Sequence, residues 1–303
     1  MGNLTRPPPL RRQGATVPFR SATRTPVAPL LLALALALAL ALSGCAESGA
    51  PEGAPATKSP ADSDRQVRQL PDQPFDYQLG GAYPPPEGVR TVVRDRTAAP
   101  EPGAYNICYV NAYQTQPDEV GWWRKNHPDL LLRDADGDLV VDEDWQEPLL
   151  DISTAGHRER LARIVGGWFD GCAKKGFDGL DSDNLDSYLR SDGLLDRKQA
   201  SAFAELLVAR AHRAGLAIGQ KNAADMAPVG HRLGFDFAIA EECARYEECA
   251  AYADAYDDKV LVIEYRGADL TAACREWGER LPIVLRDRDL VPAGRSGHVN
   301  ERC

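Results

Sequence analysis

Several motifs that mark common enzyme classes are missing from this sequence of 303 residues. It has no Cys-x-x-Cys, and its five histidines do not cluster at ligand spacing, so a zinc site is not expected. No Gly-x-Gly-x-x-Gly joins a predicted strand to a helix, so a dinucleotide cofactor is not indicated. Gly-x-Ser-x-Gly is also absent, and no histidine ends a predicted strand, so Ser-His-Asp catalysis fits poorly. We therefore expect an activity that needs neither a bound metal nor an organic cofactor.

The first 44 residues contain no acidic residue and five arginines, followed by an unbroken apolar run over 30–42. As a helix this run is about 20 Å long, too short to cross a hydrocarbon layer of about 30 Å. Residues 42–45, Leu-Ser-Gly-Cys, are similar to the bacterial lipobox, whose cysteine carries a diacylglycerol. The pattern predicts a lipoprotein signal peptide over 1–44 and a lipid on Cys45, at the extracellular face of the bacterial cell membrane. A plain secretory signal cleaved nearby is the alternative.

Acidic residues outnumber basic ones, 45 to 35, which gives a formal charge of −10. Cleavage of the predicted leader would remove five of the basic residues and no acidic one, leaving a charge of −15. Such a surface repels nucleic acid and attracts cationic solutes and polymers. We therefore expect no nucleic-acid partner.

Besides Cys45 the sequence has six cysteines, an even number in a chain predicted to enter an oxidising compartment. They are Cys108, Cys172, Cys243, Cys249, Cys274 and Cys303. Disulfides are expected from this context. Cys243 and Cys249 are a candidate pair, because a short loop can bring their Cα atoms to the required separation of about 5.5 Å.

The composition changes near residue 74. Residues 46–73 are rich in Ala, Pro, Gly, Ser and Asp and poor in large apolar side chains, which is typical of a flexible tether. We assign 45–73 to a lipidated, disordered linker and 74–303 to a single globular domain.

Eight short apolar or β-branched runs recur through this domain and predict buried strands. They cover 75–79, 89–93, 105–110, 179–182, 216–220, 235–240, 260–265 and 283–285. Helical spacing of apolar residues lies between several of them, most clearly over 161–172 and 200–211. Alternating strands and helices predict an α/β domain, and eight strands favour a closed (β/α)8 TIM-like barrel. A doubly wound open sheet is the alternative.

In such a barrel the active site lies at the carboxyl ends of the strands, so polar residues that end the apolar runs are the candidates. These are Gln78, Asp95, Asn111, Asp181, Asp183, Asn184, Lys221, Asn222, Glu241, Glu264 and Tyr265, with Tyr113 and Asp151 just beyond strand-like runs. Several carboxylates at one rim are costly unless they are paired, protonated or bound to a cation. Pairs of carboxylates on different strands are typical of glycoside hydrolases. A metal held by Asp181, Asp183 and Asp186 is the competing interpretation.

Six sequence blocks together resemble glycoside hydrolase family 114, which contains endo-α-1,4-polygalactosaminidases. The blocks are Phe-Asp-Tyr-Gln-Leu-Gly (75–80), Asn-Ile-Cys-Tyr-Val-Asn (106–111), Gly-Phe-Asp-Gly-Leu-Asp-Ser-Asp-Asn-Leu-Asp-Ser-Tyr (176–188), Gly-Leu-Ala-Ile-Gly-Gln-Lys-Asn (215–222), Glu-Glu-Cys-Ala-Arg-Tyr (241–246) and Val-Ile-Glu-Tyr (262–265). The resemblance implies a TIM-like barrel with Asp183 of the Asp-Asn motif and Glu241 of the Asn-Glu-x-Cys motif as the catalytic pair. Ala240 stands where the family often has Asn.

The resemblance also implies the reaction. We expect an extracellular glycosidase that cleaves α-1,4-linked, cationic or partly N-acetylated galactosamine polysaccharide with retention, using Asp183 as nucleophile and Glu241 as general acid and base. The other candidates would hold sugar hydroxyls or orient these two acids. A catalytically silent carbohydrate-binding lipoprotein and a hydrolase of another α-linked glycan are the alternatives.

Overall fold

The computed structural model describes residues 66–303. The predicted signal peptide, the lipidation site Cys45 and most of the predicted linker therefore lie outside the described residues. Within 66–303, no helix is both long enough and apolar enough to span a membrane.

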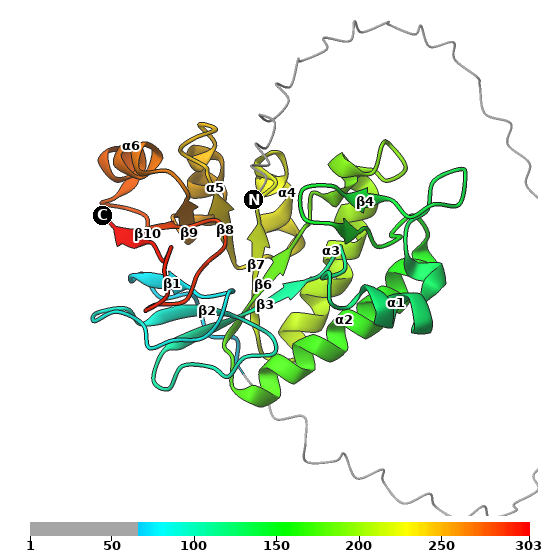
Figure 1. Cartoon of the computed structure of the whole chain (residues 1–303), viewed down its shortest axis with the longest axis horizontal. Coiled ribbons are helices and arrows are strands. Elements are labelled where there is room, and N and C mark those ends of the chain that lie inside the picture. Colours follow the sequence, from blue (N-terminus) through cyan, green and yellow to red (C-terminus); the bar gives the residue numbers. More distant parts are fainter. Residues whose placement is uncertain (1–65) are drawn as a thin grey trace, which may run out of the picture. The chain divides into compact units, whose positions relative to one another are not determined.

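Eight parallel strands follow one another in chain order around a curled sheet (Figure 1), and a ninth strand is antiparallel to the last of them. They are β1 (Phe75–Tyr77), β2 (Thr91–Asp95), β3 (Tyr105–Asn111), β6 (Gly179–Asp183), β7 (Ala217–Lys221), β8 (Phe237–Glu241), β9 (Val260–Glu264), β10 (Ile283–Arg286) and the antiparallel β11 (Asn300–Arg302). A separate small hairpin is formed by β4 (Val141–Asp142) and β5 (Glu147–Pro148). Each of the eight predicted strands overlaps one of the parallel strands.

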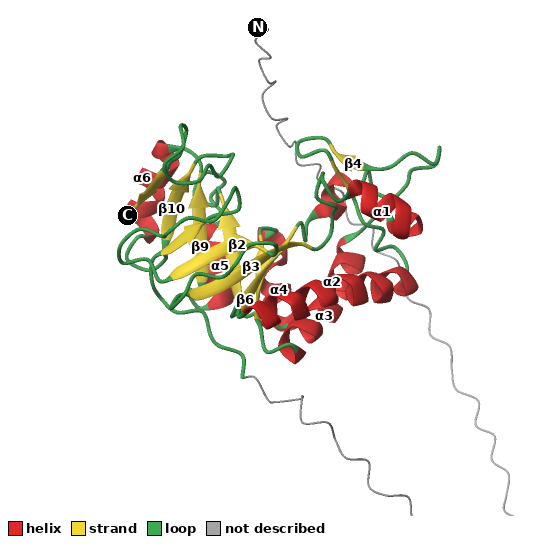
Figure 2. Ribbon diagram, turned by 60° about the horizontal axis from the view of Figure 1, so that its bottom comes forward, coloured by secondary structure: helices red, strands yellow, loops and turns green. Residues whose placement is uncertain are grey.

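Most helices pack on the outer side of the curled sheet (Figure 2), whereas the first lies beside the second and packs Trp123 against Trp168. They are α1 (Val120–Asn126), α2 (Ala155–Lys175), α3 (Arg197–Arg213), α4 (Ala227–Leu233), α5 (Cys249–Tyr256) and α6 (Gly267–Trp277), with single 3-10 turns η1 (Pro128–Leu130), η2 (Ser187–Arg190) and η3 (Ala224–Met226). The connections from β1 to β2 and from β2 to β3 contain no helix. The outer layer is therefore incomplete beside the first strands.

The two longest helices form where the sequence pattern predicts them. Helix α2 buries Leu161, Val165 and Phe169 along one face. Helix α3 begins with a capping box between Asp196 and Gln199, which satisfies two backbone N–H groups at the helix start. Gly215 follows the end of α3 with φ of 71°, the left-handed conformation that glycine adopts at little cost.

Alternate strand residues fill the barrel interior, because successive side chains of a strand point to opposite faces. This inner cluster consists of Phe75, Tyr77, Val93, Tyr105, Ile107, Tyr109, Ala217, Phe237, Ile239, Leu261, Ile263 and Val284. The residues between them pack outward against the helices. Gly219 makes room for Phe237, since a Cβ atom at position 219 would lie 2.4 Å from that ring. The interior is thus a packed core with polar residues only toward its ends.

Strand β11 lies along the seam between the last parallel strand and the first. It pairs with β10 over Val284–Arg286, and its Asn300 Nδ2 donates to Asp76 Oδ1 of β1 at 2.8 Å. Arg302 Nε donates to the carbonyl of Phe75 at 3.3 Å. Side-chain hydrogen bonds from β11 therefore join the first and last parallel strands, which backbone pairing does not connect. The TIM-like α/β barrel expected from the sequence is confirmed.

Residues 66–73 pack against the amino-terminal end of the barrel. Val67 and Leu70 contact the inner cluster, and Arg68 Nη1 donates to Asp178 Oδ1 at 2.6 Å. The hydroxyl of Tyr105, at the start of β3, donates to the carbonyl of Arg68 at 2.9 Å. The last residues of the predicted linker therefore pack against the barrel through both apolar and ionic contacts.

Three disulfides join the six cysteines of the domain, as expected. They are Cys108–Cys172, Cys243–Cys249 and Cys274–Cys303, with Cα separations of 6.2, 4.8 and 5.3 Å. The predicted pair Cys243–Cys249 is confirmed. The third disulfide ties the residue after β11 to helix α6 and so holds the strand at the seam.

Candidate active site

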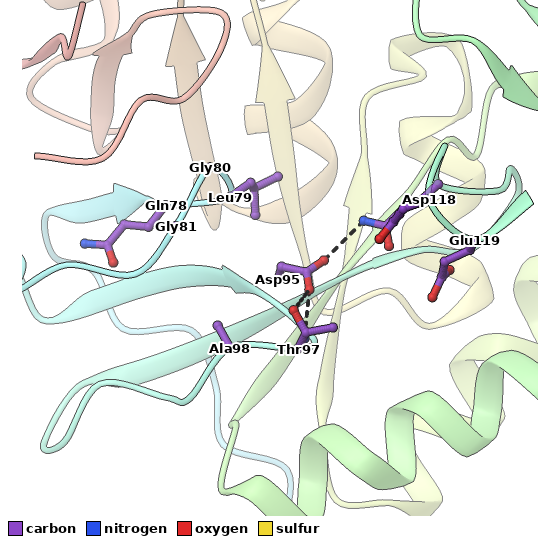
Figure 3. Close-up of a pocket in the computed structure, with 10 residues that line it drawn as sticks. Gln78, Leu79, Gly80, Gly81, Asp95, Thr97, Ala98, Asp118 and Glu119 are labelled. Carbon is purple, nitrogen blue, oxygen red and sulfur yellow. Dashed lines mark hydrogen bonds between the residues drawn. The ribbon is translucent and has the colours of Figure 1, made fainter. Parts of the chain in front are cut away.

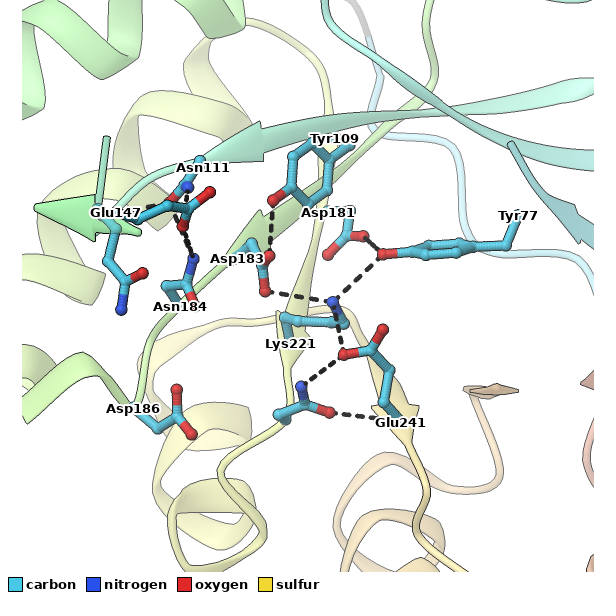
Figure 4. A network of polar contacts seen from close by, with 12 residues as sticks. Tyr77, Tyr109, Asn111, Glu147, Asp181, Asp183, Asn184, Asp186, Lys221 and Glu241 are labelled. Carbon is cyan, nitrogen blue, oxygen red and sulfur yellow. Dashed lines mark hydrogen bonds and ion pairs between the residues drawn. The ribbon is translucent and has the colours of Figure 1, made fainter. Parts of the chain in front are cut away.

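Lys221 lies at the centre of a polar cluster at the carboxyl end of the barrel (Figure 4). It ends β7, and its side chain is only 3% exposed. Its Nζ atom is 3.2 Å from Asp183 Oδ1, 3.2 Å from Glu241 Oε2 and 3.2 Å from the hydroxyl of Tyr77. Burial disfavours its charge, but the surrounding carboxylates outweigh burial and hold the pKa of Lys221 well above its usual value. One buried cation thus bridges the two acids.

Asp183 ends β6 and is held on both carboxylate oxygens. Lys221 contacts Oδ1, and the hydroxyl of Tyr109 donates to Oδ2 at 2.7 Å. Burial alone would raise the pKa of Asp183, but the Lys221 charge and the donated hydrogen bonds lower it below its ordinary value. Asp183 is therefore ionised at neutral pH.

Glu241 ends β8 and, besides Lys221, contacts Tyr265 and Asn222. The hydroxyl of Tyr265 donates to Oε1, and Asn222 Nδ2 donates to Oε2 at 3.0 Å. Asn222 Oδ1 in turn accepts from the Glu241 backbone N–H at 2.9 Å. The Asn222 amide therefore supplies a hydrogen bond to Glu241 that the alanine at position 240 has no side-chain amide to make.

Asp181 lies one layer deeper on β6 and is fully buried. The Tyr77 hydroxyl donates to Oδ2 at 2.9 Å, whereas Oδ1 has no partner among the described residues. Burial, opposed by Lys221 and assisted by Asp183, raises the pKa of Asp181 to about 7. A proton on Asp181 near neutrality reduces the negative charge beneath the mouth.

The backbone turns sharply after each of the three strands that carry the cluster. Asn184, Asn222 and Glu242 directly follow these strands and have φ angles of 66°, 51° and 57°. Asparagine tolerates this left-handed region, but glutamate does so at a cost. The Glu242 carboxylate is held by Arg245 at 2.6 Å and by Arg288 at 2.7 Å. These ion pairs help to fix the turn after Glu241.

A further carboxylate reaches the cluster from outside the barrel strands. Glu147 belongs to β5, and its Oε2 accepts a hydrogen bond of 2.8 Å from Asn111 Nδ2. Asn184 Nδ2 contacts both Asn111 Oδ1 at 3.0 Å and Glu147 Oε2 at 3.5 Å. Burial raises the pKa of Glu147 to about 7, although the Asn111 hydrogen bond lowers it. The sequence analysis did not identify this residue.

The residues that the fold brings together agree with a known family. A family model for glycoside-hydrolase family GH114 matches residues 56–303. The chain belongs to family GH114. It is therefore a glycosidase, and the resemblance noted in the sequence is confirmed.

Solved structures show the same fold. A crystal structure of Aspergillus fumigatus Ega3 in complex with galactosamine is 24% identical, with a TM-score of 0.62, and the match covers 82% of this chain and all (100%) of that one. The glycoside hydrolase domain of PelA from Pseudomonas aeruginosa is 15% identical, with a TM-score of 0.52, over 75% of this chain and 99% of that one. No curated protein sequence matches the chain.

In this GH114 glycosidase, most of the predicted site residues lie in one connected network. The network contains Asn111, Asp181, Asp183, Asn184, Lys221, Asn222, Glu241 and Tyr265. It also contains Tyr77 and Tyr109, which the sequence analysis missed along with Glu147. Tyr77 lies two residues after Phe75 on β1 and Tyr109 lies two residues before Asn111 on β3, so the alternation of side chains along these two strands would have indicated that both point inward.

Two predicted residues point away from the barrel mouth. Gln78 is buried and hydrogen-bonds through Nε2 to Asp76 and through Oε1 to Arg94. Tyr113 packs edge-on against Phe203 of α3, outside the barrel. Neither side chain joins the network around Lys221, and their roles as sugar contacts stay predictions.

Two predicted acids serve local structure instead. Asp151 accepts from the Ser153 backbone N–H at 2.9 Å and contacts His157 Nδ1 at 2.9 Å, before α2. Glu264 points outward from β9, where its Oε1 accepts from the Ala244 backbone at 2.9 Å. Burial raises the pKa of Glu264 to about 7. Neither carboxylate joins the network around Lys221.

Asp95 lines a separate cavity of about 270 Å³ (Figure 3). The cavity lies beyond the carboxyl ends of β1 and β2, and Asp118 and Glu119 also border it. Asp95 Oδ1 accepts from the Thr97 backbone at 2.8 Å, and Oδ2 accepts from Gln116 Nε2 at 3.2 Å. Asp95 therefore stabilises a turn beside the mouth and stands apart from the cluster around Lys221.

The acids proposed as alternative metal ligands do not form one ligand set. Asp181 and Asp183 are engaged by tyrosine hydroxyls and Lys221, whereas Asp186 points away from them (Figure 4) and pairs with Arg190 at 2.9 Å. Elsewhere in residues 66–303, Cys243, Cys249 and Glu264 offer atoms close enough to share a metal, but both sulfurs belong to a disulfide. The cluster around Lys221 instead suits acid–base and nucleophilic chemistry.

Proposed function

We propose that this GH114 glycosidase hydrolyses α-1,4-linked galactosamine polysaccharide with retention of configuration, outside the cell. The observation that carries the proposal is the pair Asp183 and Glu241, held at one barrel mouth by the shared cation Lys221. Two carboxylates in different environments are what glycoside hydrolysis requires.

Asp183 is the nucleophile in this proposal because its lowered pKa keeps it ionised. Its oxygen attacks C1 of the sugar while Glu241 gives a proton to the departing glycosidic oxygen. Glu241 then removes a proton from water, whose oxygen attacks C1 and releases Asp183. The tyrosine and amide contacts described above orient both carboxylates for these transfers.

The spacing of the two acids favours retention. Asp183 Oδ1 and Glu241 Oε2 each lie 3.2 Å from the same nitrogen, so these atoms are separated by no more than twice that distance. Inverting enzymes place their carboxyl groups about 6.5–9.5 Å apart to leave room for water, whereas retaining enzymes need about 5–5.5 Å. The Lys221 bridge draws the pair toward the shorter arrangement.

Charge and the solved relatives support the substrate. Deacetylated galactosamine polymers carry ammonium groups, and the predicted mature chain has a formal charge of −15 after loss of the five leader arginines. The Ega3 structure contains galactosamine. A partly N-acetylated amino-sugar polymer is therefore the first substrate to test.

Incubating the soluble domain with polygalactosamine and with unrelated glycans, and measuring new reducing ends, tests this function. We expect reducing ends from polygalactosamine only. Binding without cleavage would instead indicate a silent carbohydrate-binding protein, and cleavage restricted to another α-linked glycan would reassign the substrate.

The location is proposed from the leader and the sequence Leu-Ser-Gly-Cys at 42–45. Signal peptidase cleavage before Cys45 and lipidation of its thiol would anchor the enzyme at the extracellular face of the cell membrane. Mass spectrometry of the native protein tests this: a longer mature chain with an unmodified Cys45 would refute it.

A further inference from the structure

Glu147 approaches the catalytic cluster from outside the barrel strands. It lies in the β4–β5 hairpin, within the long connection between β3 and β6. Its side chain is nevertheless buried and reaches the network around Asp183 (Figure 4). A polar residue carried to an active site by an inserted hairpin is well placed to set specificity.

The two amides that hold Glu147 also flank Asp183. Asn111, which donates to Glu147 at 2.8 Å, is the partner of Asp183 in the β3–β6 register. Asn184, whose Nδ2 lies 3.5 Å from Glu147 Oε2, directly follows Asp183. The Glu147 carboxylate is thus anchored beside the residue proposed to bond to C1 of the sugar.

Unlike Asp183 and Glu241, Glu147 lacks a cation. Among residues 66–303, no lysine or arginine forms an ion pair with it. The guanidinium of Arg190, whose charge lowers the pKa of Glu147, is engaged by Asp142 at 2.8 Å and by Asp186 at 2.9 Å. A buried carboxylate without a cation is costly to ionise, and a cation that enters the site would relieve this cost.

We propose that Glu147 binds the ammonium group of the sugar unit whose C1 reacts with Asp183, and thereby selects a deacetylated unit at that position. The amine of galactosamine is on C2, next to the reacting carbon, so a carboxylate beside Asp183 is within its reach. An acetamido group carries no charge to pair with Glu147 and is larger. This inference rests on the proposed function and adds the residue that recognises the amine.

The ionisation of Glu147 makes the selection depend on pH. Burial, with Asp183 and Asp142, raises the pKa of Glu147 to about 7, while Asn111 and Arg190 lower it. Below that pH the carboxyl is protonated and cannot form the ion pair, so the KM for deacetylated substrate rises. The KM for N-acetylated substrate does not change with the ionisation of Glu147.

The test uses a partly acetylated galactosamine polymer and compares the wild type with Glu147→Gln and Glu143→Gln. Glutamine keeps an acceptor oxygen for Asn111 and Asn184 and removes only the charge. Glu143 is exposed on the same hairpin and is the matched control. Because the new reducing end is the unit that reacted at C1, mass spectrometry of the products reports whether that unit was acetylated.

In the wild type and in Glu143→Gln, we expect free amines to predominate at the new reducing ends. Glu147→Gln should reduce this preference about tenfold, as expected for loss of one partly buried ion pair. An unchanged preference in Glu147→Gln, or an equal fall in kcat on all substrates, would overturn the inference while leaving the proposed function intact. If the wild type releases no reducing ends at all, the proposed function fails first and the inference fails with it.

A second measurement needs no variant. The wild-type preference for free amines should fall when the pH is lowered from about 7.5 to about 5.5. A preference that stays constant across this range would refute a role for the Glu147 charge, even if Glu147→Gln does not fold.

Discussion

Replacing Lys221 with methionine removes the cation of the site and keeps the length of the side chain. In the wild type, the Nζ atom of Lys221 lies 3.2 Å from both Asp183 Oδ1 and Glu241 Oε2. The lysine side chain is 3% exposed, so water does not readily take its place. The variant therefore leaves the buried Asp183 charge without its counter-charge.

The size of the effect follows from these distances. At 3.2 Å and an effective dielectric constant of about 20, one such pair attracts by about 5 kcal/mol. Desolvation offsets part of this attraction, and breaking a buried ion pair typically costs about 3–5 kcal/mol. We expect the free energy of unfolding of Lys221→Met to be lower than that of the wild type by about 3–5 kcal/mol at neutral pH. The fall should shrink in acid, because protonation of Asp183 removes the uncompensated charge.

The same change acts on the rate through Asp183. Burial raises the pKa of this carboxyl, and Lys221 is the largest influence that lowers it. Without the lysine the pKa rises, so the nucleophile is protonated at pH values where the wild type is active. The acidic limb of the pH–rate profile should move to higher pH, and the rate near pH 6 should fall at least about a hundredfold, equivalent to about 2.7 kcal/mol.

The assay is the initial rate of polygalactosamine hydrolysis across a pH series, with urea unfolding of the same preparations. Lys198→Met, an exposed change on α3, is the control and should match the wild type. A Lys221→Met enzyme with an unmoved acidic limb would refute the view that Lys221 keeps Asp183 ionised.

Three further predictions concern neighbours of Lys221. Asp183→Asn and Glu241→Gln should each lower kcat at least about a thousandfold while the protein stays folded; a normal rate with a lowered melting temperature in Asp183→Asn would make Asp183 a turn-capping residue. Tyr265→Phe removes the hydrogen bond to Glu241, so the activation barrier for kcat should rise by about 1.5–3 kcal/mol. An unchanged kcat would exclude a role for that hydroxyl. Asp181 has a pKa raised by burial to about 7, so its contribution to stability is full at acidic pH and is lost as the pH rises through about 7. Asp181→Asn should therefore flatten the decline in urea stability between about pH 5 and about pH 8, and an unaltered decline would contradict the assignment.

Apolar runs and strand-end polarity were sufficient to predict the barrel and much of the site. The runs that became β6, β7 and β8 end on the side chains that meet at the mouth, because parallel strands present their carboxyl ends together. Asp183, Lys221 and Glu241 could therefore be selected without a structure.

One physical reason explains why Gln78 and Glu264 lie outside the network around Lys221. A strand end identifies a location along the barrel axis, but only the alternation of side chains decides whether a residue points to the mouth or to the helices. Gln78 and Glu264 end their runs on the outward face, whereas Tyr77 and Tyr265, each one residue away, point inward. Sequence patterns do not fix the end of a strand to within one residue, so they cannot decide which of two adjacent residues points inward.

Glu147 was beyond such reasoning for a different cause. It lies in a short hairpin whose position depends on packing across the connection between β3 and β6, and the four residues before it are exposed whereas Pro148 and Leu149 after it are buried. No periodicity links it to Asn111 or Asn184. Only tertiary structure brings a carboxylate from this hairpin beside Asp183.

The docking of residues 66–73 beneath the barrel has a consequence for how the enzyme meets its substrate. Arg68 is fastened to Asp178 at the end of the barrel opposite to Asp183 and Glu241. Any attachment upstream of this segment would therefore join the enzyme at the amino-terminal end of the barrel, opposite to the carboxyl end that carries Asp183 and Glu241. An enzyme attached at this end would present Asp183 and Glu241 to polymer that arrives from its surroundings.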